Sequence, residues 1–251
     1  MHKLTLKDIK PISDYEETRR AFQAYVAVLR RDRFVPVGPR VNILFENRQT
    51  ILFRLQETLR AANILESTRM LEEVAAFNQL LPDPGELVAT MYVEFPAADG
   101  AQDASRLDRD KGAEGPSSRG IAAAVSLQLG ARLRVPATSH PFPRSSQARA
   151  VYYLRFALSR AAVQALRDPT AQVIVRIEEP GYRHQHALGL ECRRSLAADL
   201  GGRGKRRPAA DPLDGVDHGP ALALSRRGRP ASARAAPSVP GRGGSTPGEI
   251  V

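Results

Sequence analysis

The chain has 251 residues, including one cysteine and no tryptophan, and its formal net charge is +10 at pH 7. With Cys192 alone, it forms no internal disulfide and supplies no thiolate set for a zinc or iron–sulfur site. No stretch approaches the roughly 20 apolar residues that span a bilayer, and the first residues lack the apolar run of a signal peptide. We therefore expect a cytoplasmic protein without a membrane segment.

The positive charge is unevenly distributed. Residues 1–100 carry a formal charge of −1 and residues 151–200 carry +2, whereas residues 101–150 carry +4 and residues 201–251 carry +5. The regularly patterned parts of the chain are thus nearly neutral. The overall charge is therefore not the footprint of a nucleic-acid-binding face on a folded domain.

The first predicted helix starts at Ser13. Ser13 and Glu16 have the spacing of a capping box, and apolar residues then recur at helical spacing: Phe22, Val26 and Leu29. Arg30, Arg31 and Arg33 follow near its end, where cations complement the helix dipole. A site for an anion or nucleic acid is the alternative interpretation of these arginines.

A strand that leads directly into a helix is predicted next. Residues 41–46 include alternating apolar positions, Asn47 can cap the following helix, and an apolar stripe comes after it: Ile51, Leu52, Leu55 and Leu59. Another helix is predicted from Ser67 to the turn at residues 82–85. On that helix, we expect Asn78 to hydrogen-bond a neighbouring loop.

The second half of the chain reads mostly as strands. Alternating apolar residues predict strands at 86–95, 125–135 (a strand or a hairpin around Gly130), 151–156 and 173–177, and Ser159 can cap a short helix. Residues 97–120 lack apolar periodicity and are expected to form a flexible loop. The order of elements predicts an α+β fold over residues 1–200, with N-terminal helices packed on a largely antiparallel sheet.

The C-terminal segment, residues 201–251, has a different composition. Gly and Pro make up 17 of its 51 residues, which is typical of low-complexity sequence, so we expect a disordered basic tail. Its arginine runs can bind nucleic acid, although a solvated tail is favoured. Because Arg, Ala, Gly and Pro have GC-rich codons, a shifted reading frame is an alternative origin of this segment.

The most concentrated set of candidate site residues spans Glu46 to Arg60. Glu46 and Asn47 lie where a helix begins, and backbone N–H groups at such a position bind anions. Arg48 follows in the first turn, and Glu57 and Arg60 share a helix face. The functional interpretation is a charge-paired pocket for an acidic ligand or a metal; the simpler one is a capped amphipathic helix with surface ion pairs.

A second candidate lies at Tyr182, His184 and His186. In an extended segment, the two histidines project to the same side, and neutral imidazoles bind zinc, iron or other transition metals. A third ligand has to come from elsewhere, for example from Glu46 or Glu57. The alternative interpretation is a pair of ordinary histidines.

Several separated motifs resemble one family. KLTLKDI, VGPRVNILFENRQTILFRLQETLRA, FNQLLPDPGELVATMYVEF, AVYYLRFALS and EEPGYRHQHALG occur in the order found in the uncharacterised bacterial family called domain of unknown function 3501. The resemblance covers most of residues 1–96 and 125–200. The sequence departs from the family pattern in residues 97–120 and at Gln185, where relatives often carry Glu.

The resemblance implies an accessory or binding role beside a rubrerythrin-like or iron–sulfur oxidoreductase protein, in redox or peroxide defence. It names no cofactor, and the chain lacks the common catalytic motifs, so we lean towards a protein that is not an enzyme. The alternative hypothesis is a metal- or anion-binding enzyme that uses Glu46, Arg48, Glu57 and His184. It predicts that these side chains meet in one cleft.

Overall fold

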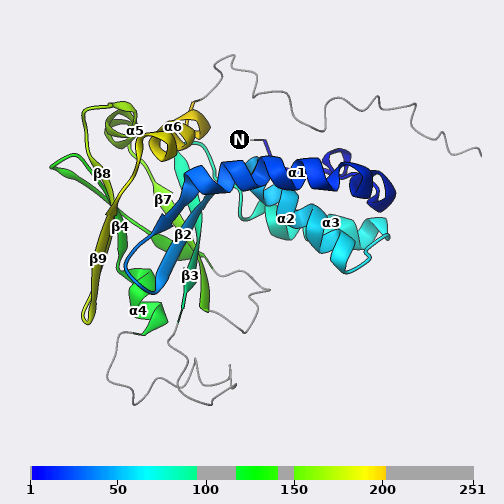
Figure 1. Cartoon of the computed structure of the whole chain (residues 1–251), viewed down its shortest axis with the longest axis horizontal. Coiled ribbons are helices and arrows are strands. Elements are labelled where there is room, and N and C mark those ends of the chain that lie inside the picture. Colours follow the sequence, from blue (N-terminus) through cyan, green and yellow to red (C-terminus); the bar gives the residue numbers. More distant parts are fainter. Residues whose placement is uncertain (1, 95–116, 141–149, 202–251) are drawn as a thin grey trace, which may run out of the picture. The chain divides into compact units, whose positions relative to one another are not determined.

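The computed structural model describes residues 2–94, 117–140 and 150–201 (Figure 1). All of them belong to one unit, Met1–Gly215. The expected flexible loop lies outside the described residues from 97 to 116, and so does the expected tail from residue 202 onward. At the end of the expected loop, Ser117 caps a short helix, so this part of the prediction is corrected.

The described strands form two antiparallel sheets. Sheet A has the order β1 (Phe34–Pro36), β2 (Val41–Glu46), β3 (Glu86–Val93), β7 (Ala150–Ala157) and β6 (Thr138–His140). Sheet B has the order β5 (Leu133–Pro136), β4 (Val125–Leu129), β8 (Val173–Glu179) and β9 (Tyr182–Ala187). Alternation of apolar residues predicted which residues share a face, but not that the strands separate into two sheets.

The described helices are distributed around these sheets. They are the 3-10 helix η1 (Leu6–Asp8) and the α-helices α1 (Ile12–Arg33), α2 (Arg48–Ala61), α3 (Ser67–Asn78), α4 (Ser118–Ala123), α5 (Arg160–Arg167) and α6 (Leu190–Asp199). Figure 1 shows α5 and α6 together at one end of the sheets and α4 at the opposite end. None of the helices that the structure describes has the length and apolar character needed to cross a membrane.

The inner faces of the two sheets share one apolar core. Phe45, Met91 and Phe156 from sheet A pack in the same cluster as Leu127 and Val175 from sheet B, and all of them are fully buried. Alternate residues of each strand point inward, so every second position contributes to this cluster. The opposite positions are left to form the two outer faces.

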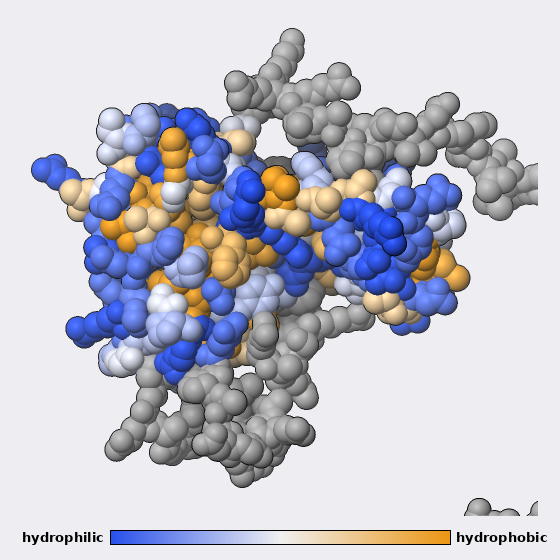
Figure 2. All heavy atoms as spheres, in the orientation of Figure 1, coloured by the Kyte–Doolittle hydropathy of each residue, from blue (hydrophilic) through white to orange (hydrophobic). Residues whose placement is uncertain are grey.

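A helical layer covers the outer face of sheet A. α1, α2 and α3 bury a second apolar cluster that includes Tyr15, Phe22, Leu55 and Phe77 from the helices and Tyr153 from β7. Figure 2 shows that the exposed surface of these helices is mostly hydrophilic. The amphipathic faces predicted for them are thus buried against one another and against the sheet.

The α+β prediction is confirmed, as is the role of Asn78. Its side chain accepts a hydrogen bond from the backbone N–H of Leu4 at 2.7 Å and donates one to the carbonyl of Leu4 at 2.9 Å. It therefore holds the N-terminal segment against α3. This bidentate contact joins residues far apart in the sequence.

The predicted start of α1 is wrong. The helix begins at Ile12, Pro11 occupies the N-cap, and the hydroxyl of Ser13 donates to Asp14. Proline fixes a backbone angle suited to this end of a helix, where its missing N–H costs no helical hydrogen bond. At the other end, Arg33 is buried and bonded to Asp199 of α6 at 2.6 Å.

Candidate functional site

Glu46 and Asn47 lie at the junction between β2 and α2. Asn47 is the N-cap of α2, and its side-chain oxygen accepts hydrogen bonds from the backbone N–H groups of Gln49 and Thr50, each at 3.0 Å. The predicted cap is therefore confirmed. Because the side-chain oxygen of Asn47 already accepts hydrogen bonds from these two N–H groups, they do not offer a ready site for an anion.

The carboxylate of Glu46 is buried beneath α2, on the outer face of sheet A. Its Oε1 accepts hydrogen bonds from Thr90 at 2.6 Å and from Arg54 at 3.0 Å, and its Oε2 accepts one from Thr50 at 2.6 Å. A polar side chain that is 0% exposed needs such partners, because burying it without hydrogen bonds destabilises the fold. The fold itself supplies them.

Arg54 completes this buried network. It donates from Nη2 to the hydroxyl of Tyr153 at 2.9 Å, and its guanidinium lies 5.7 Å from the centre of that ring. Burial is the largest single influence on the pKa of Arg54 and lowers it, but the charge of Glu46 and the interactions with Tyr153 together raise the pKa above its usual value. Sequence reasoning missed this residue, although a lone charge within the apolar stretch of α2 was the available signal.

Arg48 belongs to a different contact. Its Nη2 lies 2.5 Å from Oδ1 of Asp8 in η1. Burial tends to raise the pKa of Asp8, but the hydrogen bond and charge of Arg48 lower it below its ordinary value. Arg48 therefore ties the N-terminal segment to α2.

Glu57 is bonded between α1 and α2. Its two oxygens accept hydrogen bonds from Nε and Nη2 of Arg19 at 2.8 and 3.0 Å, and Oε1 also accepts one from Tyr15 at 2.8 Å. The contact with Arg60, predicted from their spacing, is present at 3.3 Å. Hydrogen bonding from Arg19 is the main cause that lowers the pKa of Glu57 to about 2, whereas burial and the bond to Glu57 raise the pKa of Tyr15.

Tyr182 fastens the edge of sheet B to the loop between β1 and β2. Its hydroxyl donates to the carbonyl of Val37 at 2.6 Å and accepts from the backbone N–H of Arg40 at 3.2 Å. The Arg40 guanidinium also lies 5.1 Å from the centre of the Tyr182 ring. Tyr182 is thus buried by contacts within the fold.

His184 and His186 lie on the same side of β9, opposite Ile177 and Val175 of β8. The ring of His184 packs 4.5 Å from that of Tyr182, between ring centres. Across residues 2–94, 117–140 and 150–201, no group of three His, Cys, Asp or Glu side chains is placed to hold a metal ion. A metal role for the two histidines stays a prediction.

The candidate residues are therefore brought together only in part. The structure joins Glu57 with Arg60, Glu46 with the helix start at Asn47, and Tyr182 with His184. The residues of the hypothesised enzyme site have separate partners: Thr50, Thr90 and Arg54 for Glu46, Asp8 for Arg48, Arg19 and Tyr15 for Glu57, and Tyr182 for His184.

A further group of polar residues lies on the outer face of sheet B, and sequence reasoning did not select it. We call this group the arginine face; it consists of Ser126, Gln128, Arg134, Arg176, Glu178, Arg183 and Gln185. The register places Arg176 between Ser126 and Gln185, and Glu178 beside Arg183. The apolar residues that alternate with them on β4, β5 and β8 pack in the core, so strand alternation was the available signal for these positions.

The carboxylate of Glu178 lies among arginines. Its Oε2 accepts a hydrogen bond from Arg134 at 2.5 Å, and its Oε1 lies 3.7 Å from Arg176. Hydrogen bonding from Arg134, followed by the charges of Arg134, Arg176 and Arg183, lowers the pKa of Glu178 although burial opposes the shift. This one carboxylate faces three guanidinium groups, so the group keeps an excess of positive charge.

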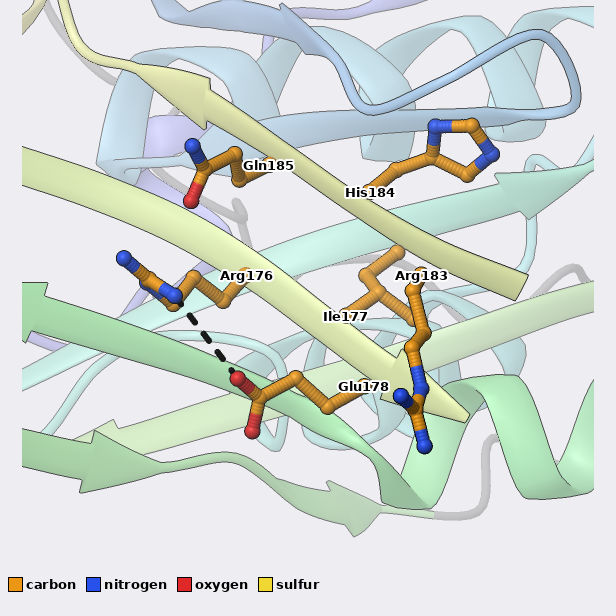
Figure 3. A pocket seen from close by; sticks show the side chains of 6 residues that line it. All are labelled: Arg176, Ile177, Glu178, Arg183, His184 and Gln185. Carbon is orange, nitrogen blue, oxygen red and sulfur yellow. Dashed lines mark ion pairs between the residues drawn. The ribbon is translucent and has the colours of Figure 1, made fainter. Parts of the chain in front are cut away.

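A cavity of about 430 Å³ lies over the β8–β9 pair (Figure 3). It is lined by Arg176, Ile177, Glu178, Arg183, His184 and Gln185. Figure 3 shows that all these side chains come from the two neighbouring strands. Guanidinium and amide groups at an open cavity can donate hydrogen bonds to carboxylates or other oxyanions.

Comparison with known proteins identifies the family. The pattern of the family described as "Protein of unknown function (DUF3501)" matches residues 3–200. The chain belongs to this family. The matched range ends where the expected tail begins, and it includes the helical layer and both sheets.

A solved structure has a similar fold. It is described as a "novel protein of unknown function" from Burkholderia pseudomallei K96243, with 25% sequence identity and a TM-score of 0.67, and the match covers 80% of this chain and 100% of that one. No functionally curated protein matches the sequence. The similarity thus supports the fold, and names no activity.

Proposed function

We propose that this chain is a cytoplasmic accessory protein that binds a redox partner through the arginine face. The partner is the rubrerythrin-like or iron–sulfur oxidoreductase protein that the family resemblance implies. The observation that carries the proposal is the cluster of Arg134, Arg176 and Arg183 around the carboxylate of Glu178, in which Arg134 and Arg183 are exposed and Arg176 is half-buried.

The two outer faces differ in what is available for binding. Charged groups on the outer face of sheet A, such as Glu46, are bonded to Arg54 and other groups beneath the helices. On sheet B, the side chains of Arg134 and Glu178 are 51% and 44% exposed. An interaction with another protein is therefore better supported at sheet B.

The chemistry of the arginine face favours an acidic protein surface. Arginine is enriched at protein interfaces, where its planar group donates several hydrogen bonds to carboxylates. The face has no aromatic residue, so it offers no platform on which the bases of single-stranded nucleic acid stack. An acidic patch on a protein fits these properties.

Binding can be tested with the purified rubrerythrin-like protein encoded by the same genome. The full chain is immobilised, and the amount of retained partner is measured at about 50 mM and about 300 mM salt. We expect retention above a control bait and a marked decrease at high salt, because exposed charges are screened over about 10 Å or less. No retention at low salt would contradict the proposal.

Charge reversal locates the interface. The double variant Arg176→Glu/Arg183→Glu is expected to bind the partner at least roughly tenfold more weakly, since it turns an attractive face into a repulsive one. Arg20→Glu/Arg69→Glu is the matched control, because it makes the same charge change at exposed positions on α1 and α3. Equal loss in both variants would show that only net charge matters.

A further inference from the structure

The edges of the two sheets differ in how well they are protected. β1 and β5 have 3 and 4 residues and end in Pro36 and Pro136, and β6 has 3 residues. β9 has 6 residues, Tyr182–Ala187, and contains no proline. Short strands and prolines block pairing with further strands, so β9 is the most open edge among the described strands.

The backbone of β9 has one free side. The strand pairs with β8 from Tyr182 to Ala187, and within the described part of the chain no other strand adjoins it. Figure 1 shows β9 at the margin of sheet B, and the loop between β1 and β2 contacts the Tyr182 and His184 side chains of this strand. A row of backbone N–H and C=O groups at such an edge is a template for another strand.

The charges along this edge select the kind of strand. Arg183 and Gln185 are exposed on the outer side of β9, and Arg176 lies beside Gln185 on β8. A second copy of β9 would place an Arg183 from each chain on the paired strands, and like charges on adjacent strands are unfavourable. Glutamate or aspartate side chains on the added strand would instead meet guanidinium groups.

We infer that the partner adds an extended acidic segment beside β9 as a fifth strand of sheet B. This rests on the proposed function, because it describes how the partner binds the arginine face. Main-chain hydrogen bonds to β9 provide the affinity, and alternate acidic side chains on the outer side provide the specificity.

The cavity over β8 and β9 gives these side chains room. Adjacent strands are roughly 4.8 Å apart, so an added strand lies roughly 9.6 Å from β8, a distance that glutamate and arginine side chains can bridge together. The opening of about 430 Å³ is lined by Arg176, Arg183 and Gln185. Arg176 and Arg183 share one side of the strand pair, with their guanidinium groups apart (Figure 3), so separate acidic side chains of the added strand would meet them.

A designed peptide tests strand addition without the natural partner. The probe is an end-capped peptide in which Thr and Glu alternate over six residues, because Thr favours strands and Glu supplies the charge. We expect saturable binding to the full chain and slower hydrogen exchange of the backbone amides of Tyr182–Ala187. A peptide with Lys in place of Glu is expected to bind at least tenfold more weakly.

Backbone methylation separates strand addition from simple charge attraction. A peptide with the same sequence, N-methylated at the alternate residues whose N–H groups would face β9, keeps its charge but loses the ladder hydrogen bonds. We expect binding at least tenfold weaker than that of the parent peptide, and a similar loss for Arg183→Glu. Equal binding of the parent and the N-methylated peptides would overturn the inference. So would the finding that the free protein is a dimer in which the β9 amides are already protected from exchange.

The two proposals fail in different ways. If the rubrerythrin-like protein is retained but the acidic peptide does not bind, the partner binds in another way and strand addition is wrong. If the peptide binds as expected but that protein is not retained, the edge accepts acidic strands and the choice of partner is wrong.

Discussion

The outer faces of the two sheets handle charge in opposite ways. On sheet A, the helical layer covers Glu46, and the carboxylate is bonded to Thr50, Thr90 and Arg54 within the fold. On sheet B, the carboxylate of Glu178 pairs with Arg134 and Arg176 and lies in the field of Arg183, and Glu178, Arg134 and Arg183 are exposed. A buried charge needs its partners for the protein to fold, whereas an exposed charge has little influence on folding and remains available for binding.

The covered face provides the largest expected effect. Glu46→Gln leaves Arg54 of α2 without its counter-charge, while nearly preserving the side-chain volume. We expect the free energy of unfolding to fall by about 3 kcal/mol, in the range measured when one partner of a buried ion pair is removed. Urea unfolding of the variant and the parent protein measures the difference.

A second variant shows whether this loss comes from the unpaired charge. Replacing both residues, as in Glu46→Gln/Arg54→Met, removes the buried charge as well, so the loss should be smaller than the sum of the two single losses. If Glu46→Gln changes the free energy of unfolding by less than about 0.5 kcal/mol, the covered charges on sheet A stabilise the fold no more than exposed charges do.

The contact between the two sheets is tested at Gly38. Its φ of +75° is unfavourable for other residues, and an added Cβ would lie 2.5 Å from the ring of His184. We expect Gly38→Ala to cost about 2 to 3 kcal/mol, because backbone strain and overpacking add. Urea unfolding again measures the loss.

Gly130 provides a matched control for this effect. It also has a positive φ, +62°, but an added Cβ there meets no atom within 4 Å. Gly130→Ala should therefore cost only the backbone term, about 1 kcal/mol. The double variant Gly38→Ala/His184→Ala should recover part of the loss in Gly38→Ala; if it is no more stable than Gly38→Ala, the clash with His184 is not the cause.

Local features of the fold could be predicted from the sequence. The cap at Asn47, the contact between Glu57 and Arg60 and the apolar faces of α2 and α3 depend on residues a few positions apart. Spacing along a helix determines such neighbours directly. The helix α6 was not predicted, because its buried face is narrow and includes Arg193 beside Cys192 and Leu196.

Partnerships between distant strands could not be predicted in the same way. Glu46 meets Thr90 because β2 pairs with β3, and Arg54 reaches Tyr153 because β7 pairs with β3. A sequence shows which residues of a strand share a face, but the register and the strand order come from the tertiary fold. The arginine face was missed for the same reason, since its residues come from all four strands of sheet B.

The hydrogen bonds around Glu57, which is partly exposed between α1 and α2, should make the free energy of unfolding depend on pH. Glu57 is ordinarily half protonated near pH 4.5, but in the fold its pKa is about 2, chiefly because of the hydrogen bonds from Arg19. The ionised carboxylate therefore contributes stability that is fully present above about pH 4.5 and is lost as the pH falls towards 2. We expect Glu57→Gln to be about 1 kcal/mol less stable than the parent at pH 7.

Unfolding of both proteins at a series of pH values measures this dependence. The difference between them should shrink between about pH 4.5 and pH 2, because the parent carboxyl becomes neutral there. A difference that stays constant over this pH window would mean that the charge of Glu57 does not contribute to stability, and that its hydrogen bonds stabilise the fold equally when the carboxyl is neutral.

The exposed face provides the smallest expected effect on stability. Glu178→Gln removes the carboxylate that partly neutralises Arg134, Arg176 and Arg183, and we expect no measurable change in the free energy of unfolding. Binding of the acidic partner should strengthen, by roughly twofold to fivefold, because the face becomes more positive. Glu191→Gln, at an exposed ion pair on α6, makes the same charge change away from this face and should leave binding unchanged. If Glu178→Gln weakens binding instead, the carboxylate holds the arginines in the geometry that the partner needs, and the face is an ordered site rather than a patch of positive charge.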